Sequence, residues 1–93
     1  MLQKIKDAYL LWCGYHNTIP KNQRYSLGQR IDTLFVESIE AIAAASFLTK
    51  DQKIPYVMRG IQKIDTLKIL LMVLWESKAL DNKKYIALSA LLD

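Results

Sequence analysis

Apolar residues that recur at steps of three and four dominate this chain, and turn-forming residues are scarce. The 93 residues include three glycines and two prolines, whereas a sandwich or barrel of similar length would need a turn about every ten residues. Spacings of three and four place apolar side chains on one face of an α-helix. The pattern therefore predicts an all-α protein with few loops.

The first half of the chain predicts two helices. Apolar spacing indicates a first helix over residues 2–16, followed by a connection at residues 16–20. Pro20 suits the first turn of the next helix, where its missing N–H is not needed. No proline interrupts residues 21–48, which predicts one long helix of about 40 Å. Gly28 lies inside it, at a cost of roughly 1 kcal/mol unless close packing requires a glycine.

The second half predicts two more helices. A third helix is expected to begin between Asp51 and Tyr56, with Pro55 in its first turn, and to end near Lys78. Asp81 is a favourable N-cap for a fourth helix. Short connections favour antiparallel neighbours. The expected fold is therefore an antiparallel up-down-up-down four-helix bundle, formed by residues 1–93 as a single domain.

The fourth helix is too short for this bundle. About twelve residues span only about 18 Å, roughly half the length of the second and third helices. We expect either that the chain is cut short or that another subunit fills the gap. The run from Ile69 to Trp75 is apolar on every side, more than one face of a small bundle buries. We interpret Ile69, Met72 and Val73 as an oligomer interface.

Composition limits the class of protein. The longest apolar run is far shorter than the roughly 20 residues that span a bilayer, so no transmembrane helix is expected. Charges near the N-terminus replace the apolar segment of a signal peptide, which favours the cytoplasm. Cys13 is the only cysteine and is expected to be a small buried residue. The formal charge of +4 is compatible with binding a polyanion.

No pattern indicates catalysis or metal binding. His16 is the only histidine, and Glu37 and Glu40 have no histidine three residues beyond them, as four-helix di-metal sites require. The sequence contains no phosphate-binding glycine loop, dinucleotide fingerprint or nucleophile elbow. We expect a non-catalytic protein that needs no metal and no cofactor.

The basic residues form two groups. Lys21, Arg24 and Arg30 have no acidic residue among them, and the bundle topology brings their end of the molecule near Lys78, Lys83 and Lys84. The second group contains these residues: Lys50, Lys53, Arg59 and Lys63. Tyr25 and Tyr56 each lie near a predicted helix start and could stack on a base. A solvated, mildly basic surface is the alternative interpretation.

One stretch resembles a known family. Residues 19–32, Ile-Pro-Lys-Asn-Gln-Arg-Tyr-Ser-Leu-Gly-Gln-Arg-Ile-Asp, followed by a long apolar helix, resemble the accessory variability determinant proteins of diversity-generating retroelements. Residues 64–71 and 80–85 resemble that family's third helix and the start of its fourth. These proteins belong with four-helix-bundle proteins encoded in intervening sequences of 23S ribosomal RNA genes.

The resemblance implies a basic homopentamer of four-helix protomers that binds the element's reverse transcriptase and its template RNA. Such a protein supports mutagenic reverse transcription without catalysing it. The positions that match basic places of the family pattern are Lys21, Arg24, Arg30 and Lys68. Arg59 and Lys63 are added as binding candidates from their charge alone. The alternative is a protein-interaction bundle of the intervening-sequence type with no nucleic-acid role.

The chain departs from the family pattern at two places. Met72 replaces a residue that is often basic in the family, which could weaken or relocate the binding surface. The sequence also stops at Asp93, whereas the family's fourth helix usually continues into a glycine-rich segment containing tryptophan.

Overall fold

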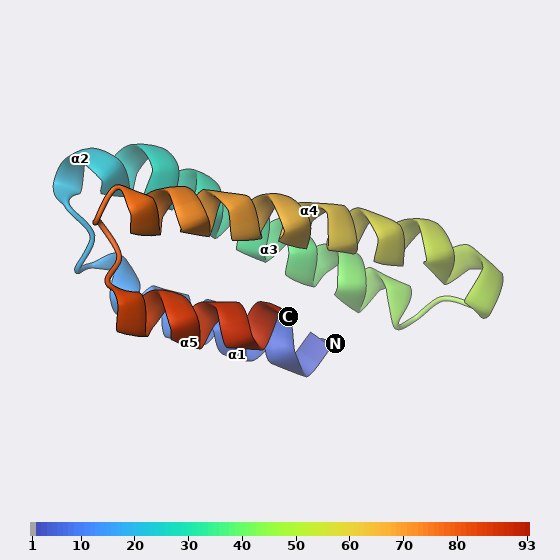
Figure 1. The fold of residues 1–93 in the computed structure, drawn as a ribbon. Helices are drawn as coiled ribbons and strands as arrows, with labels where there is room; N and C mark the ends of the chain where they lie inside the picture. The colour runs from blue at the N-terminus through green and yellow to red at the C-terminus, as the bar shows by residue number, and fades with distance from the viewer. Residues whose placement is uncertain (1) are drawn as a thin grey trace.

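The computed structural model describes residues 2–93, which form helices joined by short turns (Figure 1). The elements in chain order are α1 (Leu2–His16), α2 (Lys21–Gln23), the π-helix η1 (Arg24–Gly28), α3 (Gln29–Ala45), α4 (Lys50–Glu76) and α5 (Asn82–Leu92). No strand occurs within the described range. The prediction of an all-α protein is confirmed.

Four helices pack together as two pairs. α3 lies along α4, and α1 lies along α5, with the second pair packed against one half of the first (Figure 1). The turn between α3 and α4 therefore projects beyond the start of α1 and the end of α5. The molecule is elongated, with extents of 42 × 22 × 19 Å.

The core lies where all four helices meet. Trp12 from α1 packs against Phe35 from α3 with ring centroids 6.2 Å apart, and both side chains are fully buried. Apolar side chains from the other helices complete this core, and the largest of them are Leu67, Leu71, Leu74 and Leu88. The apolar stripes at steps of three and four thus form the core, because each faces the other helices.

Gly60 allows α3 and α4 to approach closely. A Cβ atom at this position would lie 2.9 Å from Cγ1 of Ile42 and 3.8 Å from Cβ of Ala41. The first distance is shorter than a carbon–carbon contact allows. The glycine is therefore required by the spacing of this helix pair, and its cost in helix propensity is offset by packing.

The second predicted helix differs from the structure in two ways. The backbone stays helical from Lys21, but residues 24–28 form a π-turn, and α3 ends at Ala45 instead of Leu48. Ser46 accounts for the earlier end, because its hydroxyl donates to the carbonyl of Ala43 at 2.7 Å. Serine side chains that bond to the backbone in this way compete with helix continuation.

The start of the third predicted helix is also corrected. α4 begins at Lys50, so Pro55 lies in the second turn and not in the first. Proline there removes one backbone hydrogen bond, the one that would reach the carbonyl of Asp51. Asp51 is an exposed residue near the start of the helix, so the loss of this bond does not bury an unpaired carbonyl in the core. The helix tolerates Pro55 because the affected turn lies at the projecting end.

α4 ends in a Schellman motif. The N–H of Ala79 donates to the carbonyl of Leu74, and the N–H of Lys78 donates to that of Trp75, both at 3.0 Å. Lys78 has a φ of 66°, the left-handed conformation that glycine usually supplies. The predicted end near Lys78 is thus close to the observed one. Asp81 caps α5 as predicted, because its carboxylate accepts from the N–H of Lys84 at 2.9 Å.

Two burial predictions are wrong. The apolar spacing of three and four predicts a core position for Ile61 on the third helix, but this residue is 40% exposed, because it faces the open cleft between α4 and Ile5 of α1. Cys13 was expected to be buried but is exposed, since it lies on the outer face of α1. The prediction of a short fourth helix is confirmed by α5. Because α5 is short, one half of the α3–α4 pair remains exposed.

Substituting Gly60 tests the close approach of α3 and α4. We expect Gly60→Ala to lower the free energy of unfolding by about 1–3 kcal/mol, because the new methyl group overpacks against Ile42. Gly14→Ala is the matched control, since nothing lies within 4 Å of its added Cβ, and it should stabilise α1 by about 0.5–1 kcal/mol. Urea unfolding measures both values. Stabilisation by both substitutions would show that the helices are not held this close.

Replacing Lys78 tests the end of α4. Lys78→Gly should raise the free energy of unfolding by about 1 kcal/mol, because glycine adopts a positive φ without the steric cost of Cβ. Lys78→Ala removes the same charge and keeps Cβ, so it should leave stability within about 0.5 kcal/mol. Thermal unfolding of the two variants compares them directly, and equal midpoints would contradict the left-handed conformation.

Candidate nucleic-acid interface

The segment with the family-like sequence forms the turn into α3. Pro20 precedes α2 in an extended conformation, and its carbonyl accepts from the N–H groups of Gln23 and Arg24. The chain then widens into the π-turn η1, which ends at the buried Gly28. A Cβ at Gly28 would lie 3.3 Å from the carbonyl oxygen of Gln23 and 3.7 Å from Nε2 of His16. Single π-turns inside helices often occur at functional sites.

Arg24 holds this turn against the preceding loop. Its Nη2 donates to the carbonyl oxygens of Asn17 at 2.9 Å and Ile19 at 3.0 Å. Its Nε is buried and has no hydrogen-bond partner among residues 2–93. The guanidinium is therefore committed mainly to the fold, although it was predicted as a binding residue.

Lys21 and Arg30 are free for a ligand. Both are exposed, and neither takes part in an ion pair, since the ion pairs within residues 2–93 are Lys63–Glu37 and Lys68–Asp93. Tyr25 lies between them in the chain and is 65% exposed. The expectation that Tyr25 has a face free for stacking agrees with this exposure.

Two side-chain hydrogen bonds join the segment around residues 18–23 to the end of α4 and the start of α5. Gln23 donates to the hydroxyl of Ser77 at 3.0 Å, and Nζ of Lys84 donates to the hydroxyl of Thr18 at 3.0 Å. Lys84 also lies over the ring of Tyr15, 5.3 Å from its centroid. The expected proximity of Lys84 to the Lys21 end is confirmed, because these bonds connect the two loops.

A cleft of about 290 Å³ opens beside η1. The side chains that line it are His16, Arg24, Tyr25, Gln29 and Asp32. Burial raises the pKa of Tyr9 above its usual range, and hydrogen bonds with Cys13 and Asp32 and the charge of Asp32 raise it further. The Tyr9 side chain is therefore a neutral phenol at neutral pH. Its raised pKa does not change the free energy of unfolding until the pH exceeds about 10, the pKa of tyrosine in the unfolded chain.

Two members of the second basic group, Arg59 and Lys63, lie beside acidic residues. Nζ of Lys63 is 3.2 Å from Oε1 of Glu37, and the guanidinium of Arg59 lies over the ring of Tyr56, 5.6 Å from its centroid. A shallow groove between α3 and α4 also contains Glu40 beside these groups. Two carboxylates offset two cations there, so the groove has little net charge to attract a polyanion.

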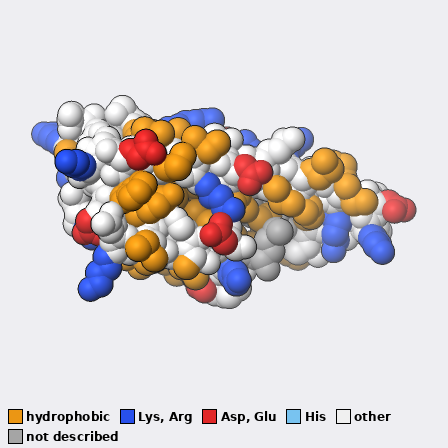
Figure 2. Space-filling model, viewed as in Figure 1, with side chains coloured by type: hydrophobic (Ala, Val, Ile, Leu, Met, Phe, Trp, Pro, Cys, Tyr) orange, Lys and Arg blue, Asp and Glu red, His pale blue; other side chains and the backbone are white. Residues whose placement is uncertain are grey.

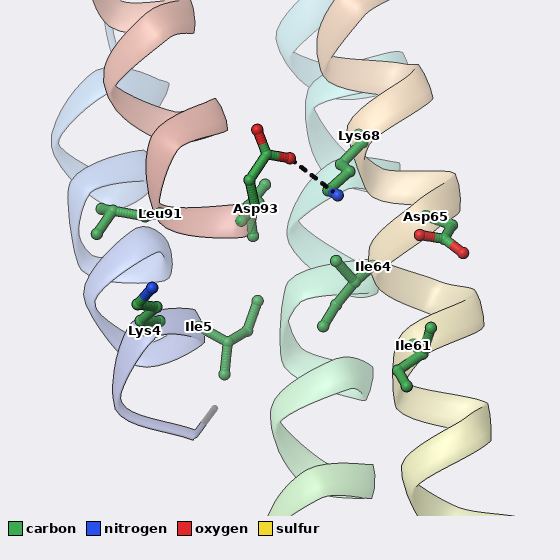
Figure 3. Close-up of a pocket in the computed structure, with 9 residues that line it drawn as sticks. Lys4, Ile5, Ile61, Ile64, Asp65, Lys68, Leu91 and Asp93 are labelled. Carbon is green, nitrogen blue, oxygen red and sulfur yellow. Dashed lines mark ion pairs between the residues drawn. The ribbon is translucent and has the colours of Figure 1, made fainter.

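Lys68 also has an acidic partner. Its Nζ lies 3.0 Å from Oδ1 of Asp93 across a cleft of about 350 Å³ (Figure 3). Ile61, Ile64 and Asp65 of α4 line the same cleft, opposite Ile5 of α1 (Figure 3). Both partners are partly exposed, so water screens the pair and its contribution to stability is small.

The predicted basic residues do not form one patch. On the face in Figure 2, blue side chains are spread over both ends of the molecule, with red side chains among them. Lys21, Arg24 and Arg30 lie on the successive elements α2, η1 and α3. Arg59, Lys63 and Lys68 follow along α4 with acidic or aromatic neighbours.

Ile69, Met72 and Val73 lie on the outside of α4. Their exposed fractions are 57%, 38% and 44%. The buried residues of the same turns lie on the opposite face of α4 and are Leu67, Leu71 and Leu74. An apolar surface remains uncovered in the single chain, where an oligomer interface was predicted.

Sequence reasoning missed the acidic and polar neighbours of the basic residues. Glu37 and Asp93 are far along the chain from their partners, so only the packing of α3 and α5 on α4 brings them close. His16, Gln29 and Asp32 meet in one cleft for a similar reason. Gln29 and Asp32 are three residues apart, which places both on one face of a helix. This spacing is the signal in the sequence that could have indicated the cleft.

No helix within residues 2–93 combines the length and apolarity of a membrane span. The same part of the chain contains no group of three or more histidine, cysteine, aspartate or glutamate side chains arranged to hold a metal ion.

Removing the Arg24 guanidinium should destabilise the fold. Arg24→Gln loses both hydrogen bonds to the loop carbonyls, and we expect the free energy of unfolding to fall by about 1–3 kcal/mol. Arg30→Gln removes an equal charge from an exposed side chain and should change stability by less than about 0.5 kcal/mol. Chemical denaturation separates the two. Equal effects would mean that Arg24 does not anchor the turn.

Comparison of the chain with protein-family models, curated proteins and solved structures gives no match.

Proposed function

We propose that this chain is a non-catalytic accessory protein that binds RNA, and that the turn carrying Lys21, Tyr25 and Arg30 is its main contact surface. The observation that supports this most is the exposure of these three side chains along the successive elements α2, η1 and α3, where Lys21 and Arg30 form no ion pair within residues 2–93. Phosphates bind exposed lysine and arginine side chains, and bases stack on exposed aromatic rings.

The resemblance makes the proposal more specific. The same turn contains the family-like residues 19–32, so the proposed partners are the reverse transcriptase and the template RNA of a diversity-generating retroelement. The chain would support mutagenic reverse transcription in the cytoplasm by holding RNA near the polymerase. Lys21 and Arg30 would bind phosphate, whereas Arg24 would shape the turn. Lys63, Lys68 and Arg59 would contribute less, because their neighbours already engage them.

We also propose that the helices run in an antiparallel up-down-up-down order and that the chain forms a homopentamer. The bonds from Gln23 to Ser77 and from Lys84 to Thr18 support the first, since they join two loops at one end. The uncovered apolar side chains of Ile69, Met72 and Val73 support an oligomer. The number five comes from the resemblance.

The second candidate is a protein-interaction bundle of the intervening-sequence type. The apolar outer face of α4 favours it, because exposed apolar surface indicates contact with protein. Retained oligomerisation without affinity for RNA or polymerase would support this alternative.

Charge reversal tests the RNA surface. The double variant Lys21→Glu and Arg30→Glu should weaken binding of the template RNA by tenfold or more at low salt. The variant makes fewer phosphate contacts, so binding releases fewer counterions from the RNA. The matched control is Lys50→Glu with Lys53→Glu, which changes the net charge equally at the other end of the molecule. We expect less than threefold weakening for the control in fluorescence anisotropy.

Equal losses in the two variants would show that only net charge matters and would contradict a defined surface. No binding by the unaltered chain would contradict the RNA function itself. Co-purification with the reverse transcriptase, with and without RNA, then tests whether the polymerase is a partner.

Introducing a charge on α4 tests the oligomer. The unaltered chain should show a light-scattering mass five times its 10.7 kDa. Ile69→Lys should reduce this mass, because a buried unpaired charge is costly at an interface. Leu10→Lys is the control, since Leu10 is exposed on α1. A monomeric mass for the unaltered chain would contradict the oligomer.

A further inference from the structure

The cleft beside η1 has the chemistry of a site for one unpaired nucleobase. It is bounded by an exposed aromatic ring, a carboxylate and an amide, which come from Tyr25, Asp32 and Gln29. At about 290 Å³ it lies at the small end of ligand pockets. It is thus suited to one base and not to a longer stretch of nucleic acid.

The polar groups in the cleft differ from those of a phosphate site. Asp32 brings a carboxylate that forms no ion pair within residues 2–93, and a carboxylate repels phosphate. It accepts hydrogen bonds instead, so a favourable ligand presents N–H groups to it. The exposed cations, Lys21 and Arg30, lie outside the residues that line the cleft.

Arg24 lines the cleft, but the fold already engages its guanidinium. Its Nη2 donates to two loop carbonyls, and its Nε is buried without a hydrogen-bond partner among residues 2–93. Gln29 supplies an amide that both donates and accepts. Asp32 is hydrogen-bonded with Tyr9, and its carboxylate keeps further acceptor sites. The cleft therefore combines an acceptor on Asp32 and a donor on Gln29 with a ring on which a base can stack.

We propose that this cleft binds a single unpaired guanine of the RNA. Among the four bases, guanine alone presents two neighbouring N–H groups, N1–H and N2–H, which pair with both oxygens of a carboxylate such as Asp32. Guanine O6 is an acceptor and suits the amide N–H groups of Gln29. Stacking on Tyr25 completes the contact, as single-stranded bases stack on aromatic side chains in RNA-binding proteins. The proposal rests on the RNA-binding function proposed above.

The test uses labelled nine-nucleotide oligouridines that carry uridine, adenosine, cytidine or guanosine at the centre. By fluorescence anisotropy, the unaltered chain should bind the guanosine oligomer roughly tenfold more tightly than the others. Tyr25→Ala should weaken this binding roughly 5- to 100-fold, which is the range for a lost base–aromatic stack. Tyr56→Ala is the control, because Tyr56 lies at the projecting end and is engaged by Arg59.

Asp32→Asn separates base recognition from charge. If Asp32 accepts from guanine, the variant loses the preference for guanosine, while its affinity for oligouridine stays equal or rises. If Asp32 only repels the phosphate backbone of the RNA, the affinity of the variant for all four oligomers rises together, and this result overturns the proposal. Circular dichroism confirms that each variant remains helical with an unchanged unfolding midpoint.

The possible results of these experiments distinguish the proposed guanine site from the proposed RNA-binding function. Equal affinity for the four oligomers, lost at high salt and unchanged by Tyr25→Ala, would overturn the base site and leave RNA binding intact. No affinity of the unaltered chain for any oligomer at low salt would overturn both. A guanosine preference that disappears in Tyr25→Ala and Asp32→Asn, but persists in Tyr56→Ala, supports the site.

Discussion

The close approach of α4 to α3 at Gly60 is the constraint on which the rest of this structure depends. It fixes a long helix pair, and α1 and α5 cover only the half of that pair where Trp12 and Phe35 meet. The other half projects with exposed apolar side chains such as Phe47 and Ile54. A bundle of this shape has both a complete core and an uncovered surface.

The packing of the helices also determines which basic residues have an acidic partner and which are free to bind a ligand. α3 brings Glu37 to Lys63, and the end of α5 brings Asp93 to Lys68. The turn before α3 receives no such acidic partner, because the loop it contacts offers carbonyl oxygens, which Arg24 uses. Lys21 and Arg30 therefore remain among the exposed cations that form no ion pair within residues 2–93. The proposed RNA surface follows from what packing leaves unpaired.

The sequence predicts the helices well and the site only in part. Apolar spacing and the Asp81 cap are local properties, so the four helices could be predicted. The π-turn and the early end at Ala45 depend on bonds made by Arg24 and Ser46 to particular carbonyls, which no periodicity encodes. The pairing of Lys63 and Lys68 with acids, and the cleft containing Asp32, depend on contacts between distant segments.

Chemical-shift mapping of the 15N-labelled chain with template RNA tests the central claim most directly. We predict that the largest shifts occur at the backbone amides of residues 21–32 and at Lys84, with little change over residues 50–63. Shifts centred on residues 50–63, or spread evenly over all basic positions, would contradict the account.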